Sequence, residues 1–283
     1  DVTGHFPLYS AVEVDITSAL CDVIAMKKTA IIAGSGAEHL SPFRDWESIL
    51  VPTRFGTAEI RQGEISGKPV LFVARHGKEH STAPHLINYR AIISALSELE
   101  AVRVIGTAAV GSLSNSIPPG TAAVLTDIID FTRRGPITFF DDPAAGVVHT
   151  DFSEPYCSEI SAVLLAAAEA SGLEVTTPCT YICTDGPRYE TPAEISMFRS
   201  WGADVVGMTN APEVILSREA GLCYGSIAII TNFAAGISPK PLSHSEVVEC
   251  MKSIEEKLAA ALIGAVQALP TSWPCNCGRT TSG

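Results

Sequence analysis

The 283-residue sequence has no uninterrupted apolar run of the roughly 20 residues that a membrane-spanning helix requires. The N-terminal stretch 1–21 also lacks the basic segment followed by an apolar segment that is typical of a secretory signal peptide. We therefore predict a soluble, unsecreted protein that works in the cytoplasm and has no membrane partner.

Basic residues are scarce, because 19 Lys and Arg stand against 31 Asp and Glu and give a formal net charge of −12. The sequence contains no basic run and no arginine-rich helix, so we expect no nucleic-acid partner. A small anion such as phosphate is still compatible with this charge. Local backbone amides and one or two arginines can bind it against the overall field.

The eight cysteines are scattered, and five lie within or beside apolar stretches, as is typical of reduced core residues. The exception is the pair Cys275 and Cys277 near the C-terminus. Two cysteines separated by one residue could form a strained local disulfide, bind a metal or have no role. Zinc requires about four ligands, so this pair alone is too weak a signal, and we predict no metal site.

Apolar β-branched runs alternate with segments of helical length along the chain. The expected strands are 29–33, 70–74, 102–106, 121–129, 175–183, 205–207 and 223–230, and the expected helices are 86–99, 155–171, 191–201, 211–220 and 243–269. This alternation predicts a single α/β domain over 1–269, with a mixed central β-sheet flanked by helices on both faces. Functional residues should follow the carboxyl ends of its strands.

Both ends of the last expected helix carry local signals. Ser243 and Glu246 match a capping box, and an apolar stripe at helical spacing follows: Val247, Val248, Met251, Ile254 and Leu258. Residues 270–283 contain prolines, glycines and small polar residues, so we expect a loosely ordered tail.

Three segments that follow expected strands have residue types suited to phosphate. Gly34-Ser35-Gly36 permits a tight turn with outward amides and adds a hydroxyl donor, although such a turn is more often structural. Arg75-His76 offers a bidentate guanidinium and an imidazole, although charged loops are often only solvated. The small residues at 107–112 would let a ligand lie against the main chain, or a helix pack closely.

Two segments in the second half of the chain form the most specific pattern. They read Thr-Asp-Gly-Pro-Arg-Tyr-Glu-Thr-Pro-Ala-Glu at 184–194 and Gly-Ala-Asp-Val-Val-Gly-Met-Thr-Asn-Ala-Pro-Glu at 202–213. With the three segments above in the same order, the chain resembles the trimeric purine nucleoside phosphorylase and methylthioadenosine phosphorylase family from about Thr29 to Leu269. The resemblance implies the nucleoside phosphorylase fold and a homotrimer or dimer of trimers.

The resemblance also implies roles for individual residues. Phosphate would be held by Ser35, Arg75, His76, Ala109 through its backbone amide, and Thr209. Met208 would pack under the ribose and Tyr189 would stack on the purine or the sugar.

Two positions indicate which purine is bound. Glu190 and Asn232 match the 6-oxopurine-specific members, in which the carboxylate accepts from N1–H and the amide contacts O6 and N7. Adenine-directed relatives usually have Ser and Asp at these positions. Adenine N1 is an acceptor, so a facing carboxylate would be a mismatch of about 1–3 kcal/mol. The pair therefore favours hypoxanthine and guanine.

The 5′ end of the sugar gives a mixed signal. His244 matches the histidine that binds the 5′-hydroxyl in nucleoside-specific members, although a histidine at such a position is often only solvated. The segment around His149 is instead similar to the methylthioadenosine branch, in which the histidine approaches the 5′ group of a neighbouring subunit. We expect inosine or guanosine as substrate, with 5′-methylthioinosine or 5′-methylthioadenosine as the alternative.

The expected reaction is phosphorolysis with inversion at C1′. The glycosidic bond lengthens first, and phosphate then attacks the oxocarbenium-like ribose, with Asn232, Glu190 and His76 as the catalytic residues. No cofactor is expected, because inorganic phosphate is a co-substrate. A hydrolase using water would leave Arg75 and Ser35 without a purpose, and a non-catalytic nucleoside-binding protein would bind inosine without forming product.

Overall fold

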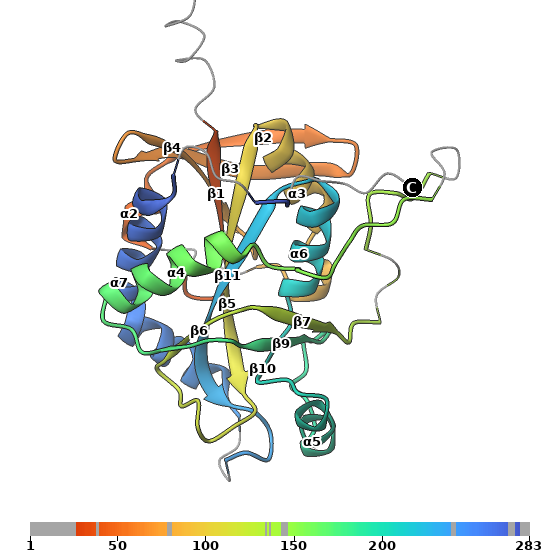
Figure 1. The fold of residues 1–283 in the computed structure, drawn as a ribbon, viewed down its shortest axis with the longest axis vertical. Coiled ribbons are helices and arrows are strands. Elements are labelled where there is room, and N and C mark those ends of the chain that lie inside the picture. Colours follow the sequence, from red (N-terminus) through yellow and green to blue (C-terminus); the bar gives the residue numbers. More distant parts are fainter. Residues whose placement is uncertain are drawn as a thin grey trace, which may run out of the picture.

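The structure is a computed structural model that describes residues 27–37, 40–77, 81–133, 135, 137–142, 147–238, 242–270 and 275–277. It contains one large mixed β-sheet with helices on both faces, which confirms the predicted α/β class (Figure 1). None of the described helices is both long and apolar enough to cross a bilayer.

The strands of the sheet differ widely in length. They are β1 (Lys28–Ala33), β2 (Glu47–Thr53), β3 (Gly56–Ile65), β4 (Lys68–Ala74), β5 (Ala101–Ser112), β6 (Ala122–Val124), β7 (Asp127–Asp130), β8 (Val175–Thr176), β9 (Thr180–Cys183), β10 (Val205–Gly207) and β11 (Cys223–Phe233). The main path runs β2-β3-β4-β1-β5-β10-β9-β7, while β11 pairs with β5 and β6, and β6 also pairs with β8. β1, β4, β5 and β11 are parallel neighbours and almost entirely buried, as their apolar composition predicts.

β5 has two different partners along one of its sides. Its first half pairs with β1 as far as Gly106, and its last two residues, Gly111 and Ser112, pair with β10. Between these partners, residues 107–110 have no neighbouring strand on that side among the described residues, while β11 covers the other side throughout. The sheet is therefore forked, and the fork opens toward the cavity described below.

The helices form two layers. They are α2 (Ser41–Arg44), α3 (Tyr89–Glu98), α4 (Ser158–Ala170), α5 (Pro192–Ser200), α6 (Asn210–Glu219) and α7 (His244–Ala268), with the 3-10 turn η2 (Pro84–Leu86) before α3. α4 and α7 cover one face of the sheet and α3 and α6 the other, while α5 lies at the end near β9 and β10 (Figure 1). Separate apolar clusters lie beneath the two layers and beneath α5.

Local signals account for the helix boundaries. Thr191 accepts from the Glu194 amide in a full capping box, and Pro192 follows in the first turn of α5. Ser243 likewise accepts from the amide of Glu246 and begins α7. The predicted stripe of α7 is buried except at Val248, which is 40% exposed, because it lies beyond the edge of the buried face. That part of the prediction was wrong.

The strand predictions need three corrections. The small residues at 107–112 belong to β5 and are not a loop, since pairing with β11 continues to Ser112. Segments 121–129 and 175–183 each divide into two strands, because each changes its partner strand midway. The hairpin β2-β3 was not predicted, although Ala58 and Ile60 are buried and their neighbours are more exposed, as period-two alternation requires.

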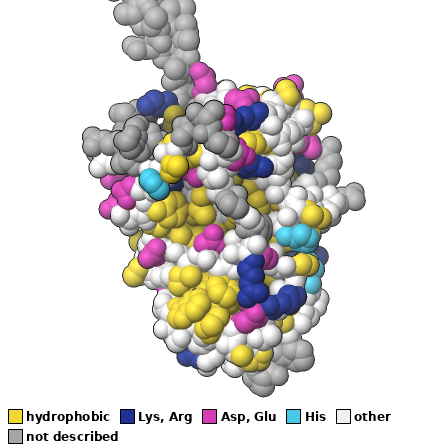
Figure 2. Space-filling model, turned by 90° about the vertical axis from the view of Figure 1, so that its right-hand side faces the viewer, with side chains coloured by type: hydrophobic (Ala, Val, Ile, Leu, Met, Phe, Trp, Pro, Cys, Tyr) yellow, Lys and Arg dark blue, Asp and Glu magenta, His cyan; other side chains and the backbone are white. Residues whose placement is uncertain are grey.

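The right side of the molecule in Figure 1, turned to the viewer in Figure 2, has hydrophobic side chains gathered beside basic and acidic ones. Among the large exposed hydrophobic residues are Val147, at 80% exposure, and Trp201, at 49%. The Trp201 ring packs on Phe131, with 5.6 Å between ring centroids.

Candidate active site

A cavity of about 310 Å³ lies at the fork in the sheet. It is bordered by the carboxyl ends of β1, β4, β10 and β11, by the unpaired stretch of β5 and by the beginning of α7. The residues predicted from sequence that line it are Ser35, Arg75, His76, Ala109, Tyr189, Glu190, Met208, Thr209, Asn232 and His244. The fold thus brings all of the predicted site residues except His149 to one cavity.

Arg75 is held by a buried ion pair. Its Nε and Nη2 both donate to the carboxylate of Glu213 in α6, the Nη2–Oε2 distance being 2.9 Å, and both side chains are 1% exposed. Nη2 also donates to the Thr107 carbonyl at 2.9 Å, while Tyr224 donates its hydroxyl to Glu213 at 2.7 Å. Burial lowers the pKa of Arg75, but Glu213 outweighs this effect and raises the pKa above its ordinary value.

The turn after β1 lies directly against this guanidinium. The amide of Gly34 donates to Thr107 Oγ1 at 3.0 Å, and a Cβ at Gly34 would collide with Arg75 Nη1. Glycine is therefore required by a close approach between the turn and the arginine. Ser35, half-buried, follows at the edge of the cavity.

The main chain of β5 presents Ala109 to the same space. Successive strand residues direct their amide and carbonyl groups to opposite sides. The carbonyl of Val110 lies 3.2 Å from Thr231 Oγ1 in β11, whereas the carbonyl of Thr107 accepts from Arg75 on the opposite side. Ala109 shares the orientation of Thr107, so its N–H points into the fork, as an anion-binding amide must.

His76 and Thr209 complete this end of the cavity. His76 Nδ1 lies 2.8 Å from the carbonyl of Thr82, so Nδ1 carries the proton and the contact fixes the ring. Thr209 is the N-cap of α6, and its amide donates to the Tyr181 hydroxyl at 3.3 Å. The positive end of the α6 dipole therefore points to the region around Arg75, which favours an anion.

Glu190 and Asn232 also line the cavity. Glu190 is 8% exposed and accepts from the Thr184 hydroxyl at 2.7 Å. Burial raises the pKa of Glu190, an effect that the hydrogen bond from Thr184 partly opposes. Asn232 follows a register shift in β11 after Ile230 and lines the cavity. Its Nδ2 donates to the Phe233 carbonyl at 3.0 Å, and its Oδ1 accepts from the Thr231 hydroxyl at 2.9 Å.

Three further residues form the walls. Tyr189 is 38% exposed, and burial of the rest of its ring raises the pKa of its hydroxyl. Met208 packs against Gly186, where a Cβ would collide with the thioether. His244 is the first residue of α7 and lies beside the apolar Leu242 and Val247.

The chain matches the phosphorylase superfamily over residues 28–267. A probable 6-oxopurine nucleoside phosphorylase from Moorella thermoacetica is 45% identical over 250 residues, covering 88% of this chain and 96% of that protein. The chain belongs to this superfamily. The 6-oxopurine nucleoside phosphorylase of Pyrococcus furiosus is also 45% identical, over 91% of this chain and 99% of the relative. A probable S-methyl-5′-thioinosine phosphorylase from Methanopyrus kandleri is 39% identical, over 91% of this chain and 99% of the relative.

Solved structures of the phosphorylase superfamily agree with the fold. Methylthioadenosine phosphorylase from Schistosoma mansoni in complex with adenine has a TM-score of 0.80 at 31% identity, covering 85% of this chain and 90% of the other. A methylthioadenosine phosphorylase from an antarctic soil metagenomic library has a TM-score of 0.82 at 30% identity, covering 89% and 90%. The family predicted from the motifs is confirmed.

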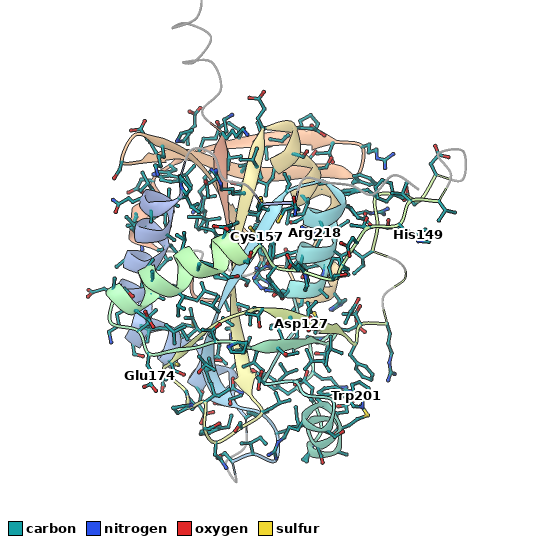
Figure 3. The ribbon with its side chains drawn as sticks, viewed as in Figure 1. Asp127, His149, Cys157, Glu174, Trp201 and Arg218 are labelled. Carbon is teal, nitrogen blue, oxygen red and sulfur yellow. The ribbon has the colours of Figure 1, made fainter. Side chains whose placement is uncertain are left out.

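His149 lies apart from this cavity. It belongs to the extended segment before α4 and is found at the right edge of the molecule, far from the central sheet (Figure 3). The role expected for it concerned a nucleoside bound in a neighbouring subunit and stays a prediction.

Sequence reasoning missed the residues that position the site. Glu213 and Thr107 contact Arg75, Thr184 contacts Glu190, and Tyr224 contacts Glu213. None of these four residues was given a role. Glu213 is fully buried in a helix whose buried face also contains Asn210 and Ser217. A mixed polar face of this kind has no apolar periodicity to mark it as buried. Only the Asn-Ala-Pro-Glu segment, as part of the longer motif, could have drawn attention to it.

Proposed function

We propose that the protein splits inosine and guanosine with inorganic phosphate to give the free purine and ribose 1-phosphate. The observation that carries the proposal is one cavity that combines a buried carboxylate, Glu190, with an amide, Asn232, and with the donors around Arg75. A carboxylate suits the N1–H of a 6-oxopurine, and an amide NH₂ suits O6 and N7. Relatives at 43–45% identity named for 6-oxopurine nucleosides support the same substrate class.

The proposed mechanism separates positive and negative charge between fixed groups. Phosphate, held by Arg75, Ser35 and the Ala109 amide, stabilises the cationic ribose and then attacks C1′ from the face opposite the purine. The purine leaves with negative charge on its O6 and N7 atoms, and Asn232 stabilises this charge by hydrogen bonding. No protein nucleophile and no cofactor enters this step. Removal of one of the stabilising groups, such as the Asn232 amide, should lower turnover by about 10²–10³-fold.

The test is purine release from inosine, adenosine and 5′-methylthioinosine, each with and without inorganic phosphate. We expect hypoxanthine from inosine only when phosphate is present. Release without phosphate would indicate a hydrolase and overturn the proposal. Preference for adenosine would overturn the roles of Glu190 and Asn232, and calorimetric binding of inosine without product would indicate a non-catalytic protein.

5′-Methylthioinosine is the second candidate substrate. Its base makes the same contacts, so only the 5′ end discriminates. The cavity places Leu242 and Val247 beside His244, and apolar side chains there suit a methylthio group. Relatives at 39–42% identity named as probable S-methyl-5′-thioinosine phosphorylases support this candidate. A higher kcat/KM for 5′-methylthioinosine than for inosine would favour it.

We also propose that the enzyme is a cytoplasmic homotrimer or dimer of trimers. The exposed apolar side chains on the right side, Trp201 among them, support an interface between subunits, because surfaces of this kind mark protein contacts (Figures 2 and 3). His149 lies on the same side, as its expected role toward a neighbouring subunit requires. A solution mass of three or six chains is expected by light scattering, and a monomer would refute the assembly.

A further inference from the structure

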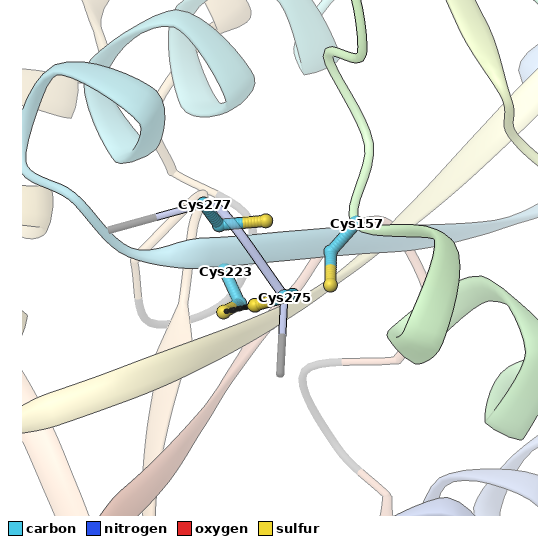
Figure 4. Close-up of side chains that lie close together, drawn as sticks. All are labelled: Cys157, Cys223, Cys275 and Cys277. Carbon is cyan, nitrogen blue, oxygen red and sulfur yellow. Dashed lines mark hydrogen bonds between the residues drawn. The ribbon is translucent and has the colours of Figure 1, made fainter. Parts of the chain in front are cut away.

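Four cysteines from three separate segments converge at one point. Cys157 is the N-cap of α4, Cys223 begins β11, and Cys275 and Cys277 belong to the C-terminal segment. Their sulfur atoms all lie within 4.8 Å of one another, and the Sγ atoms of Cys223 and Cys275 are 3.2 Å apart (Figure 4). All four are free thiols in this structure.

We propose that these four cysteines bind one Zn²⁺ ion as a closed tetrathiolate site. A tetrahedral zinc ion with Zn–S bonds of about 2.3 Å has sulfur–sulfur edges of about 3.8 Å. The Cys223–Cys275 separation of 3.2 Å is shorter than this value and no separation exceeds 4.8 Å, so shifts of roughly an ångström in side-chain positions complete the tetrahedron. Tetrahedral sites with four sulfur ligands select zinc or iron, and sites that contain four protein ligands are structural.

The surroundings suit a thiolate cluster. Cys157 and Cys277 are 2% and 7% exposed within the apolar layer of α4 and α7, so the sulfur atoms are shielded from solvent. Arg103 is the register partner of Cys223 on β5, and register partners project on the same face of a sheet. Arg103 is 5% exposed, and its guanidinium donates to the Pro270 carbonyl at 2.7 Å. A buried cation beside Cys223 favours the negative charge of the tetrathiolate.

The chain before Cys275 is also anchored. Lys68 Nζ donates to the carbonyls of Gln267 and Leu269, each at 2.7 Å, at the end of α7. Together with the contact from Arg103, these bonds bring the C-terminal segment to the beginning of β11. A metal ion there would fasten this segment to α4 and to the sheet.

The site is remote from the proposed chemistry. Cys223 and Asn232 lie on the same strand nine residues apart, which corresponds to about 30 Å of extended chain. We therefore assign the ion to stability and not to turnover. The sequence alone predicted no metal, because the Cys275 and Cys277 pair was too weak a signal without the two cysteines that the fold adds.

The test measures metal and thiols in the full chain. Protein purified under reducing conditions without chelator should contain one zinc per chain by mass spectrometry of metals. Co²⁺ added to the stripped protein should give the sulfur-to-metal charge-transfer absorption of tetrahedral thiolate coordination. Removing zinc should lower the melting temperature by about 5–10 °C, as expected for a ligand present at about 100 times its Kd, and Zn²⁺ should restore it.

Variants identify the ligands. Cys223→Ser and the double variant Cys275→Ser/Cys277→Ser should each lose the zinc and the charge-transfer band, while phosphorolysis at 25 °C stays within about twofold of the parent. Cys250→Ser is the matched control, because Cys250 is half-buried in α7 outside the cluster, and it should keep one zinc. The double variant changes no residue of the sheet, so it still tests the proposal if Cys223→Ser does not fold.

Three results would overturn the assignment. Zinc retained in the folded double variant would place the ion elsewhere. Iron in place of zinc would refute the choice of ion. A reduced chain that binds neither Zn²⁺ nor Co²⁺ would refute the metal site. A mass lower by four hydrogen atoms than that of the reduced chain would show two disulfides and would also refute it. None of these measurements depends on turnover, so the site and the proposed function fail or stand separately.

Discussion

The ion pair between Arg75 and Glu213 makes replacement of Glu213 by glutamine the most informative single change. The variant keeps the shape of the side chain but removes its charge, and it turns an NH₂ group toward one of the donors of Arg75 or toward Tyr224. Both members of the pair are 1% exposed, so water cannot take over the lost contacts. Arg75 would then be a buried cation without a charged partner.

The size of the effect follows from this burial. Breaking one partner of a buried ion pair costs about 3–5 kcal/mol. At about 2–4 °C per kcal/mol for a chain of this size, the melting temperature should fall by roughly 6–20 °C. Phosphate can supply the missing negative charge, so it should stabilise Glu213→Gln more than the parent. The guanidinium is no longer fixed, however, and misplacement by about 1 Å should lower kcat about 10²-fold.

Calorimetry with and without phosphate, together with kcat and KM for phosphate, tests this reasoning. We expect a large fall in melting temperature, partial recovery with phosphate, and a loss confined mainly to kcat. Glu219→Gln is the matched control, because Glu219 lies in the same helix, is half-buried and accepts from the Phe139 amide and from Thr138. A melting temperature within 3 °C of the parent, or a raised KM with unchanged kcat, would show that Glu213 does not position Arg75.

Further substitutions test the remaining contacts. Gly34→Ala should displace Arg75 Nη1 and lower kcat/KM for phosphate at least tenfold, with KM for the nucleoside nearly unchanged; equal activity would mean that the turn yields. Glu190→Gln should abolish most phosphorolysis of inosine. Burial raises the folded pKa of Glu190 above its ordinary value, so the carboxylate destabilises the fold as pH rises through that pKa. The variant should therefore melt higher than the parent at pH 7, and this gain should vanish below about pH 4.5. Activity of the parent on inosine should fall as pH drops through the same raised pKa. His244→Leu should lower kcat/KM for inosine more than for 5′-methylthioinosine, and an equal loss on both would remove His244 from recognition of the 5′ group.

The sequence was informative where chemistry and short-range pattern coincide. The strand ends before Gly34-Ser35-Gly36 and before Arg75-His76 could be located because apolar runs mark buried parallel strands. Residues that follow these strand ends line the cavity. The helix that begins at Ser243 could be located because its cap is local. The predicted preference for 6-oxopurines depended on Glu190 and Asn232. Their hydrogen-bonding groups match those of a 6-oxopurine and not those of adenine.

Contacts between distant residues could not be predicted in this way. Glu213 reaches Arg75 across 138 positions, and Cys275 reaches Cys223 across 52, so no local pattern connects the partners. The length of β5 was underestimated because the small residues after Gly106, including Ala108, Ala109 and Gly111, have weak strand preference. They are strand residues because β11 pairs with them along their whole length, which is a tertiary effect.

The site lies at two places where the regular pairing of the central strands is interrupted. Within the part of the chain that the structure describes, β5 has no neighbouring strand on one side between Gly106 and Gly111, and β11 shifts its register between Ile230 and Asn232. A regular ladder would use these amides within the sheet and leave none for a ligand. The interruption is held open by Arg75, because its guanidinium binds the Thr107 carbonyl where a strand would otherwise pair. The same residue thus supports the fork and faces the cavity, which explains why its position depends on a fully buried carboxylate.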